Sequence, residues 1–106
     1  MFGWKFGVET VTTDELAEKL RHGKQVLIDV REPWEFAAGH IKGSVNVPLG
    51  QLADKIGRMD PHATTYVICQ SGHRSARAVR MLERAGFEHA YSVKRGVSAW
   101  RGKLVK

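Results

Sequence analysis

Residues 69–75 bring together a thiol, a glycine and a cation in the order Cys69-Gln70-Ser71-Gly72-His73-Arg74-Ser75. Cys69 is the chain's single cysteine, so it has no partner for an internal disulfide. A thiolate is the reactive form of cysteine, and a neighbouring cation such as Arg74 favours it. Gly72 gives the backbone freedom that a tight loop needs. The segment therefore predicts a nucleophilic Cys69; the alternative is an inert buried thiol, which is common among free cysteines.

Two flanking elements must position this thiol. Thr65 to Ile68 form an apolar run typical of a buried strand, and a helix is expected from Arg74 or Ser75 to Ala85. Where a short loop curls into a helix N-terminus, backbone N–H groups can converge and stabilise an anion. We therefore expect the amides of residues 70–75 to hold a thiolate in this loop.

A second polar segment follows the expected strand at residues 26–28. Asp29 and Arg31 come directly after that strand, where open parallel sheets place their chemistry. A buried aspartate needs partners, so we expect an ion pair that braces the Cys69 loop from behind rather than contacts substrate. His40 could belong to the same polar layer.

Helices and strands alternate along the rest of the chain. A capping box from Thr12 to Glu15 begins a helix that Gly23 ends. Further helices are expected at residues 33–39 and 49–57, and further strands at residues 45–47 and 90–93. The alternation predicts one α/β domain over residues 1–106, with a mostly parallel central sheet of about five short strands and helices on both faces.

The first residues form a separate pattern. Phe2, Trp4, Phe6 and Val8 alternate with smaller or polar residues, which predicts a half-buried strand or an extended arm. The other interpretation is an exposed aromatic arm that binds a partner.

Composition limits the choice of partners. Lys plus Arg number 17 against 11 Asp plus Glu, giving a net charge of +6, but the cations are scattered and predict no nucleic-acid partner. No apolar run approaches the ~20 residues of a membrane span, so no membrane partner is expected. The histidines and cysteine lack zinc-site spacing and no nucleotide-binding glycine loop is present, so neither a metal nor a cofactor is expected. An unpaired cysteine suits a reducing compartment and predicts a cytoplasmic protein.

Two segments carry a family resemblance. Residues 69–75 resemble the active-site loop of the rhodanese family, a six-residue loop that opens with a persulfide-forming cysteine. The segment Asp29-Val30-Arg31-Glu32-Pro33-Trp34-Glu35-Phe36, followed by Gly39-His40-Ile41, Gly43-Ser44 and Asn46-Val47-Pro48, is similar to the family's other characteristic segment. The family tends to have Gly-Gly before a C-terminal tryptophan, where this chain has Arg95-Gly96 before Trp100. The resemblance implies a rhodanese-like fold over nearly the whole chain.

The activity that this resemblance implies is sulfane-sulfur transfer. The Cys69 thiolate would take the outer sulfur of a small anionic donor such as thiosulfate, release sulfite, and hold the sulfur as a persulfide. Cyanide or a thiol, including a protein thiol, would then accept it. The resemblance also implies that the remaining loop residues bind the substrate and stabilise the thiolate: Gln70, Ser71, Gly72, His73, Arg74 and Ser75.

Two of those loop residues have alternative roles. We assign Arg74 to attracting the dianionic donor; the alternative is that it pairs with a carboxylate such as Glu32 or Glu35. His73 could assist binding at the mouth of the loop, but an exposed histidine without a chemical role is favoured, since persulfide chemistry needs no general base once the thiolate exists.

Other functions remain open at this stage. A cysteine phosphatase or arsenate reductase related in fold would use Cys-x5-Arg, whereas this loop reads Cys-x4-Arg and has Ser75 at the position of that arginine. The smaller ring of amides should fit a sulfur atom better than a phosphoryl group. A third interpretation is a persulfide carrier, or a redox or regulatory interaction module, in which Cys69 does not turn over rapidly.

Overall fold

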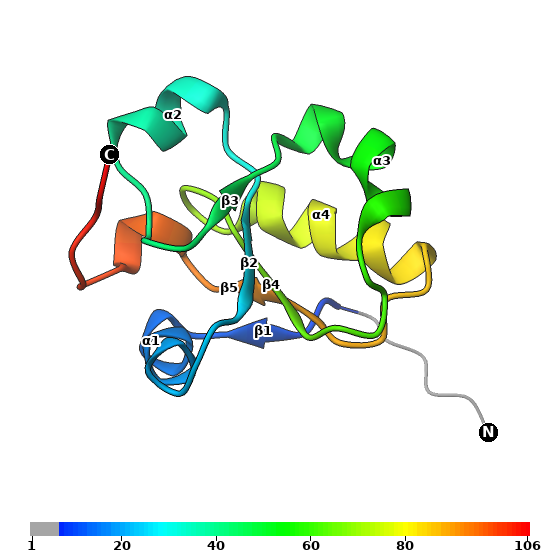
Figure 1. Ribbon diagram of the computed structural model, residues 1–106, viewed down its shortest axis with the longest axis horizontal. Coiled ribbons are helices and arrows are strands. Elements are labelled where there is room, and N and C mark those ends of the chain that lie inside the picture. Colours follow the sequence, from blue (N-terminus) through cyan, green and yellow to red (C-terminus); the bar gives the residue numbers. More distant parts are fainter. Residues whose placement is uncertain (1–6) are drawn as a thin grey trace.

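A five-stranded parallel sheet forms the centre of the computed structural model, which describes residues 7–106 (Figure 1). The strands lie in the order β1-β5-β4-β2-β3, and every neighbouring pair is parallel. They are β1 (Thr10–Val11), β2 (Val26–Asp29), β3 (Val45–Asn46), β4 (Thr65–Ile68) and β5 (Ala90–Val93). The α/β class and parallel sheet predicted from the sequence are confirmed.

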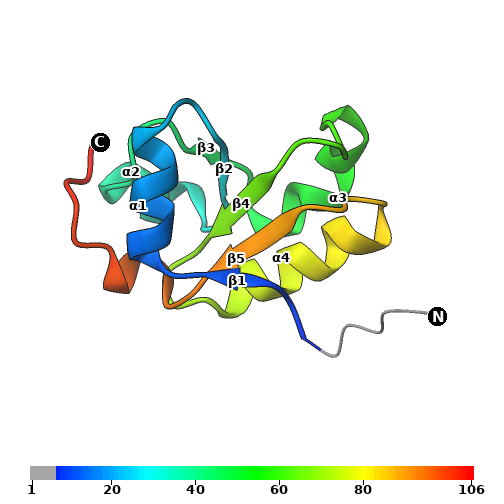
Figure 2. The ribbon, with the colours of Figure 1, turned by 90° about the horizontal axis from the view of Figure 1, so that it is seen from below.

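Helices cover both faces of this sheet, as parallel connections require (Figures 1 and 2). They are α1 (Thr13–Arg21), α2 (Pro33–Ala38), α3 (Leu52–Lys55) and α4 (His73–Arg84), with 3-10 turns η1 (Leu49–Gln51), η2 (Ile56–Arg58) and η3 (Gly96–Ala99). α1 and η3 pack on one face, and α3 and α4 pack on the other.

Strand β4 shows how the sequence divides the core between these faces. Its side chains alternate: Tyr66 and Ile68 join the cluster under α1, whereas Val67 joins the cluster under α4. All four residues of β4 are buried, which explains their continuous apolar run. Cys69 continues the alternation and belongs to the α4 cluster, so the strand carries the thiol into the molecule.

Several element boundaries differ from the expectation. α4 begins at His73 because Gly72 ends the loop in the left-handed region at φ 103°. The helix expected at residues 49–57 is one short α-helix between two 3-10 turns, whose glycines Gly50 and Gly57 disfavour a regular helix. One edge strand of the sheet is β1, whereas the aromatic segment expected as a strand or arm (Phe2, Trp4, Phe6) lies outside the described residues.

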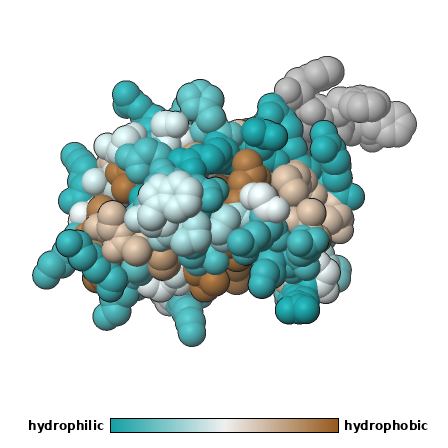
Figure 3. All heavy atoms as spheres, turned by 90° about the horizontal axis from the view of Figure 1, so that it is seen from above, coloured by the Kyte–Doolittle hydropathy of each residue, from teal (hydrophilic) through white to brown (hydrophobic). Residues whose placement is uncertain are grey.

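The face over α2 and α3 is mostly hydrophilic, with small groups of apolar atoms between the polar ones (Figure 3). Within residues 7–106, no helix has the length and hydropathy of a membrane span.

Candidate active site

Cys69 lies at the carboxyl end of β4, where the chain turns into α4. Its sulfur accepts hydrogen bonds from the Gly72 N–H at 3.1 Å and the Ser75 N–H at 3.3 Å, and the Ser75 hydroxyl lies 3.5 Å away. The loop therefore curls around the sulfur and directs backbone amides at it. This is the arrangement expected for the amides from the sequence.

The electrostatics of this ring favour a thiolate. Cys69 is 1% exposed, and burial by itself raises the pKa of its thiol. Hydrogen bonds from the Ser75 hydroxyl and from the amides of Ser75, Gly72 and Ser71 outweigh burial, so the pKa of Cys69 lies below its ordinary value. Buried free cysteines are usually inert, whereas the hydrogen bonds around this one favour the thiolate, which is the reactive form.

The Ser75 hydroxyl links the sulfur to strand β5. Its oxygen lies 2.7 Å from the Ser92 hydroxyl oxygen and 3.1 Å from the Gly72 carbonyl oxygen, in addition to its contact with Cys69. One hydroxyl hydrogen cannot serve three acceptors at once. When Cys69 is a thiolate, the Ser75 hydrogen is drawn to the sulfur and Ser92 becomes the donor to Ser75. Sequence reasoning missed Ser92. Alternation along the strand predicts that its side chain points inward, but it does not predict a polar partner there.

The turn after β5 braces the loop from its other side. The Val97 N–H donates to the Cys69 carbonyl at 2.9 Å, and the Ser98 N–H donates to the Gln70 carbonyl at 3.0 Å. Gly96 has φ 57°, and a Cβ on it would overlap the Cys69 carbonyl oxygen. This position therefore requires glycine, whereas the preceding Arg95 adopts φ 64° despite its side chain.

Arg74 makes an ion pair with α2 instead of standing free. Its Nη1 and Nη2 atoms donate to Glu35 Oε1 at 2.6 Å and Oε2 at 2.9 Å. These bonds lower the pKa of Glu35 to about 2 and raise that of Arg74. The alternative that Arg74 pairs with a carboxylate is thus what the structure shows. A compensated guanidinium attracts a dianion less strongly than a free one, so the pairing favours the alternative role of Arg74 over donor attraction.

Asp29 and Arg31 form a buried ion pair behind the loop. The Arg31 Nη2 donates to Asp29 Oδ2 at 2.8 Å and to the Gly39 carbonyl at 2.8 Å, and Nη1 lies 3.4 Å from Gln70 Oε1. The pair therefore ties β2 and the end of α2 to the Cys69 loop. Asn46 completes this corner, because its side-chain amide donates to the Asp29 and Arg31 carbonyls, each at 2.9 Å. Asn46 could have been identified from the sequence, because it belongs to the second segment that carries the family resemblance.

The side chains of three predicted residues make no hydrogen bond to the sulfur. Gln70, Ser71 and His73 are exposed, and the His73 Nδ1 lies 3.2 Å from the Ser71 hydroxyl oxygen. His40 does not join the Asp29–Arg31 pair: its Nδ1 lies 2.8 Å from the Phe36 carbonyl oxygen, and its ring stacks on that of Phe36. The helical spacing of His40 after Phe36 explains this local contact.

Within the described part of the chain, the structure gathers no group of three or more His, Cys, Asp or Glu residues suited to a metal ion. The groups gathered at the site are the Cys69 sulfur and the hydrogen-bond donors of its loop.

Comparison with known proteins places this site in a family. Residues 12–103 match the Rhodanese-like domain. The chain belongs to the rhodanese-like domain family. The match takes in both the Cys69 loop and the Asp29 segment, so the resemblance predicted from these motifs is confirmed.

Relatives within the rhodanese-like family include proteins of two kinds. The chain is 38% identical to the thiosulfate sulfurtransferase GlpE of Pseudomonas entomophila (strain L48), over 82% of this chain and 80% of that protein. It is 36% identical to the putative sulfur carrier protein YrkF of Bacillus subtilis (strain 168), over 73% of this chain and 42% of that protein. The solved structure of SSP1007 from Staphylococcus saprophyticus has a TM-score of 0.85 at 33% identity, covering 92% of this chain and 99% of that one.

Proposed function

We propose that this protein is a sulfurtransferase that carries sulfane sulfur on Cys69 from thiosulfate, or a related donor, to cyanide or a thiol. The observation that supports it most is the donor ring around the sulfur, formed by the Gly72 and Ser75 amides and the Ser75 hydroxyl. Similarity to a thiosulfate sulfurtransferase agrees with the proposal. A reducing cytoplasm, where a single cysteine stays a thiol, is the compartment that suits it.

In the first step the Cys69 thiolate attacks the outer sulfur of thiosulfate. A sulfur–sulfur bond forms at Sγ, the bond between the two thiosulfate sulfurs breaks, and sulfite leaves with the electron pair of that bond. The anionic charge of Cys69 moves to the outer sulfur of the persulfide. Amides directed into the loop can bind this sulfur as they bound the thiolate, so neither state is trapped.

In the second step an acceptor nucleophile attacks the outer persulfide sulfur. Its lone pair forms the new bond, the bond between Sγ and the outer sulfur breaks, and the electron pair returns to Cys69 as thiolate. Cyanide gives thiocyanate, and a thiolate gives a new persulfide. The cycle needs no general base because both nucleophiles react as anions.

The short loop disfavours phosphoryl transfer. Ser75 stands where a phosphatase would have the arginine that binds its substrate, and the neighbouring Arg74 is held by both oxygens of Glu35. With Cys-x4-Arg spacing, the amides converge on a region the size of one sulfur atom, since Gly72 and Ser75 already contact Sγ. Sulfur transfer is the better fit.

Intact mass spectrometry tests the proposal. The protein should gain the mass of one sulfur atom after thiosulfate treatment and lose it after a reducing thiol. Steady turnover of thiosulfate and cyanide to thiocyanate and sulfite would establish an enzyme. Loading without turnover would instead support a carrier, the function in the name of the Bacillus relative. Absence of loading would contradict both.

A further inference from the structure

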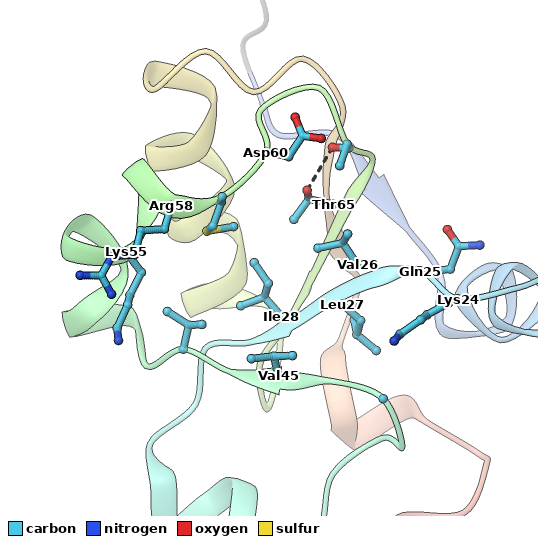
Figure 4. Close-up of a pocket in the computed structure, with 14 residues that line it drawn as sticks. Lys24, Gln25, Val26, Leu27, Ile28, Val45, Lys55, Arg58, Asp60 and Thr65 are labelled. Carbon is cyan, nitrogen blue, oxygen red and sulfur yellow. Dashed lines mark hydrogen bonds between the residues drawn. The ribbon is translucent and has the colours of Figure 1, made fainter.

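A groove lies at the end of the sheet opposite Cys69, near the beginnings of β2 and β4 (Figure 4). Its volume of about 440 Å³ is within the range of small-ligand sites. Thr65, which opens β4, lines the groove, whereas Cys69 follows the end of that strand. At the rise of a β-strand, Thr65 lies on the order of 13 Å from Cys69, and none of the lining residues belongs to the Cys69 loop. The groove is therefore distinct from the thiol loop.

Aliphatic side chains form the middle of the groove. They come from β2, the segment around β3 and the turn after η2: Val26, Ile28, Val45, Val47 and Met59. Val45 is 61% exposed and Val26 is 43% exposed, although strand residues of this type are normally covered. None of the residues that line the groove is aromatic. The walls therefore suit a flexible alkyl chain better than a flat ring system, which would gain from aromatic stacking.

Cations stand at both ends of this apolar surface. Lys24 lies at one end, and Lys55 and Arg58 lie at the other, next to α3 (Figure 4). Among residues 7–106, no carboxylate lies within ion-pair distance of any of the three. The groove's single acidic residue, Asp60, accepts the His62 N–H at 2.9 Å. The lining thus carries an excess of positive charge beside uncovered apolar side chains.

We propose that this groove binds an anionic single-chain amphiphile, with its alkyl chain over Val26 and Val45 and its carboxylate at Lys55 and Arg58. That end is chosen because two cations stand there against one at the other end. A cationic or neutral amphiphile would gain no electrostatic attraction from these lysine and arginine side chains. An extended peptide is a poorer occupant, because the lining is mainly apolar and would leave much of a peptide backbone without hydrogen-bond partners. The proposal does not depend on sulfur transfer.

Decanoate below its micelle concentration is the probe. Methyl NMR of the wild-type protein should show saturable shifts at Val26, Ile28, Val45 and Val47, and decyltrimethylammonium should bind roughly fivefold more weakly or worse. Equal binding of the two amphiphiles would overturn the proposal, as would the absence of saturable shifts with decanoate.

Charge reversal supplies the matched control. Lys55→Glu with Arg58→Glu should weaken decanoate binding by roughly tenfold, whereas Arg80→Glu with Arg84→Glu, on the exposed face of α4, should change it less than about twofold. Equal losses in the two double variants would contradict a specific site.

The NMR measurement also distinguishes two other possible ligands of the groove. If the same methyl shifts appear with protein concentration alone, the groove is a contact between two copies. If an acidic peptide produces them where decanoate does not, it is a polypeptide site. Either result would overturn the proposal.

Discussion

The two ends of the sheet differ in whether their cationic side chains have carboxylate partners. At the carboxyl end, each arginine that supports the loop has a carboxylate partner: Arg31 pairs with Asp29, and Arg74 pairs with Glu35. At the other end, Lys24, Lys55 and Arg58 have no carboxylate within ion-pair distance among the described residues. Because each of these arginines is paired with a carboxylate, its role is to hold the loop in place. The backbone amides around Cys69 then stabilise the thiolate. Uncompensated cations are free to attract a ligand.

The largest effect is expected from Cys69→Ala. This variant should lose all sulfur loading, because no second thiol exists in the chain, while its free energy of unfolding falls by only about 1 kcal/mol. Lys55→Gln at the opposite end should load sulfur as the wild type does. Intact mass and urea denaturation of both variants make the measurement. Loading that survived in Cys69→Ala would contradict the proposed mechanism.

Gly96→Ala should be the next most damaging change. A methyl group there overlaps the Cys69 carbonyl oxygen, and the position also requires a positive φ. We expect a loss of roughly 3 kcal/mol in the free energy of unfolding, together with slower sulfur loading. Gly57→Ala is the control: nothing lies within 4 Å of the added carbon and its φ is not positive, so stability should change by less than about 1 kcal/mol. Similar losses in the two variants would show that Gly96 does not brace the loop.

The Arg74→Ala variant tests whether Arg74 holds the loop in place or attracts the anionic donor. Because Glu35 already compensates the guanidinium, the variant should lower kcat/KM for thiosulfate and for an uncharged polysulfide by similar factors, each roughly tenfold. The measurement is the ratio of the two losses. A much larger loss with thiosulfate would restore the role in donor attraction first assigned to Arg74.

The Arg74–Glu35 pair should also leave a pH signature. The pKa of Glu35 falls from 4.5 to about 2 in the folded protein, so the pair contributes stability above the unfolded pKa and loses it as pH falls toward 2. Partial solvent exposure limits this contribution to roughly 1 kcal/mol. Urea denaturation of Glu35→Gln should therefore show a gap from wild type at pH 7 that closes by about pH 2. In Asp54→Asn, which removes an exposed carboxylate of α3, no comparable gap should appear.

The smallest effect is expected from Ser92→Ala. Without Ser92 as donor, the Ser75 hydroxyl is a weaker partner for the thiolate, and the pKa of Cys69 should rise slightly toward its ordinary value. The pH dependence of iodoacetamide alkylation measures this midpoint, because the reagent is neutral. Ser92→Thr retains the hydroxyl and should restore it. An unchanged midpoint in Ser92→Ala would show that the hydroxyl relay has no influence on the sulfur.

Local patterns predicted the parts of the site that depend on neighbouring residues. The buried run of β4 and the glycine in the following loop locate Cys69 at a strand end, and the Thr12–Glu15 capping box locates the start of α1. These features follow from side-chain alternation, helix capping and the conformational freedom of glycine.

Contacts between distant residues were beyond sequence reasoning. Arg74 had two candidate carboxylates, and only the packing of α2 against the loop selects Glu35. Ser92 reaches Ser75 because β5 pairs with β4, and no pattern in its own segment indicates a polar partner. The two-residue β1 is too short to show alternation, and its existence depends on pairing with β5.

The brace from η3 also sets the order in which the Cys69 loop can be completed during synthesis. Cys69 leaves the ribosome well before Val97 and Ser98, whose amides bind the two carbonyls that begin the loop. Ser92 and the β5 strand follow the loop as well, and β1, made first, must wait for β5 to pair. A nascent chain that stops short of residue 96 therefore carries Cys69 on a loop that lacks this brace. The Cys69 loop is therefore completed only after nearly the whole chain has been made, although Cys69 itself lies about two thirds of the way along the sequence.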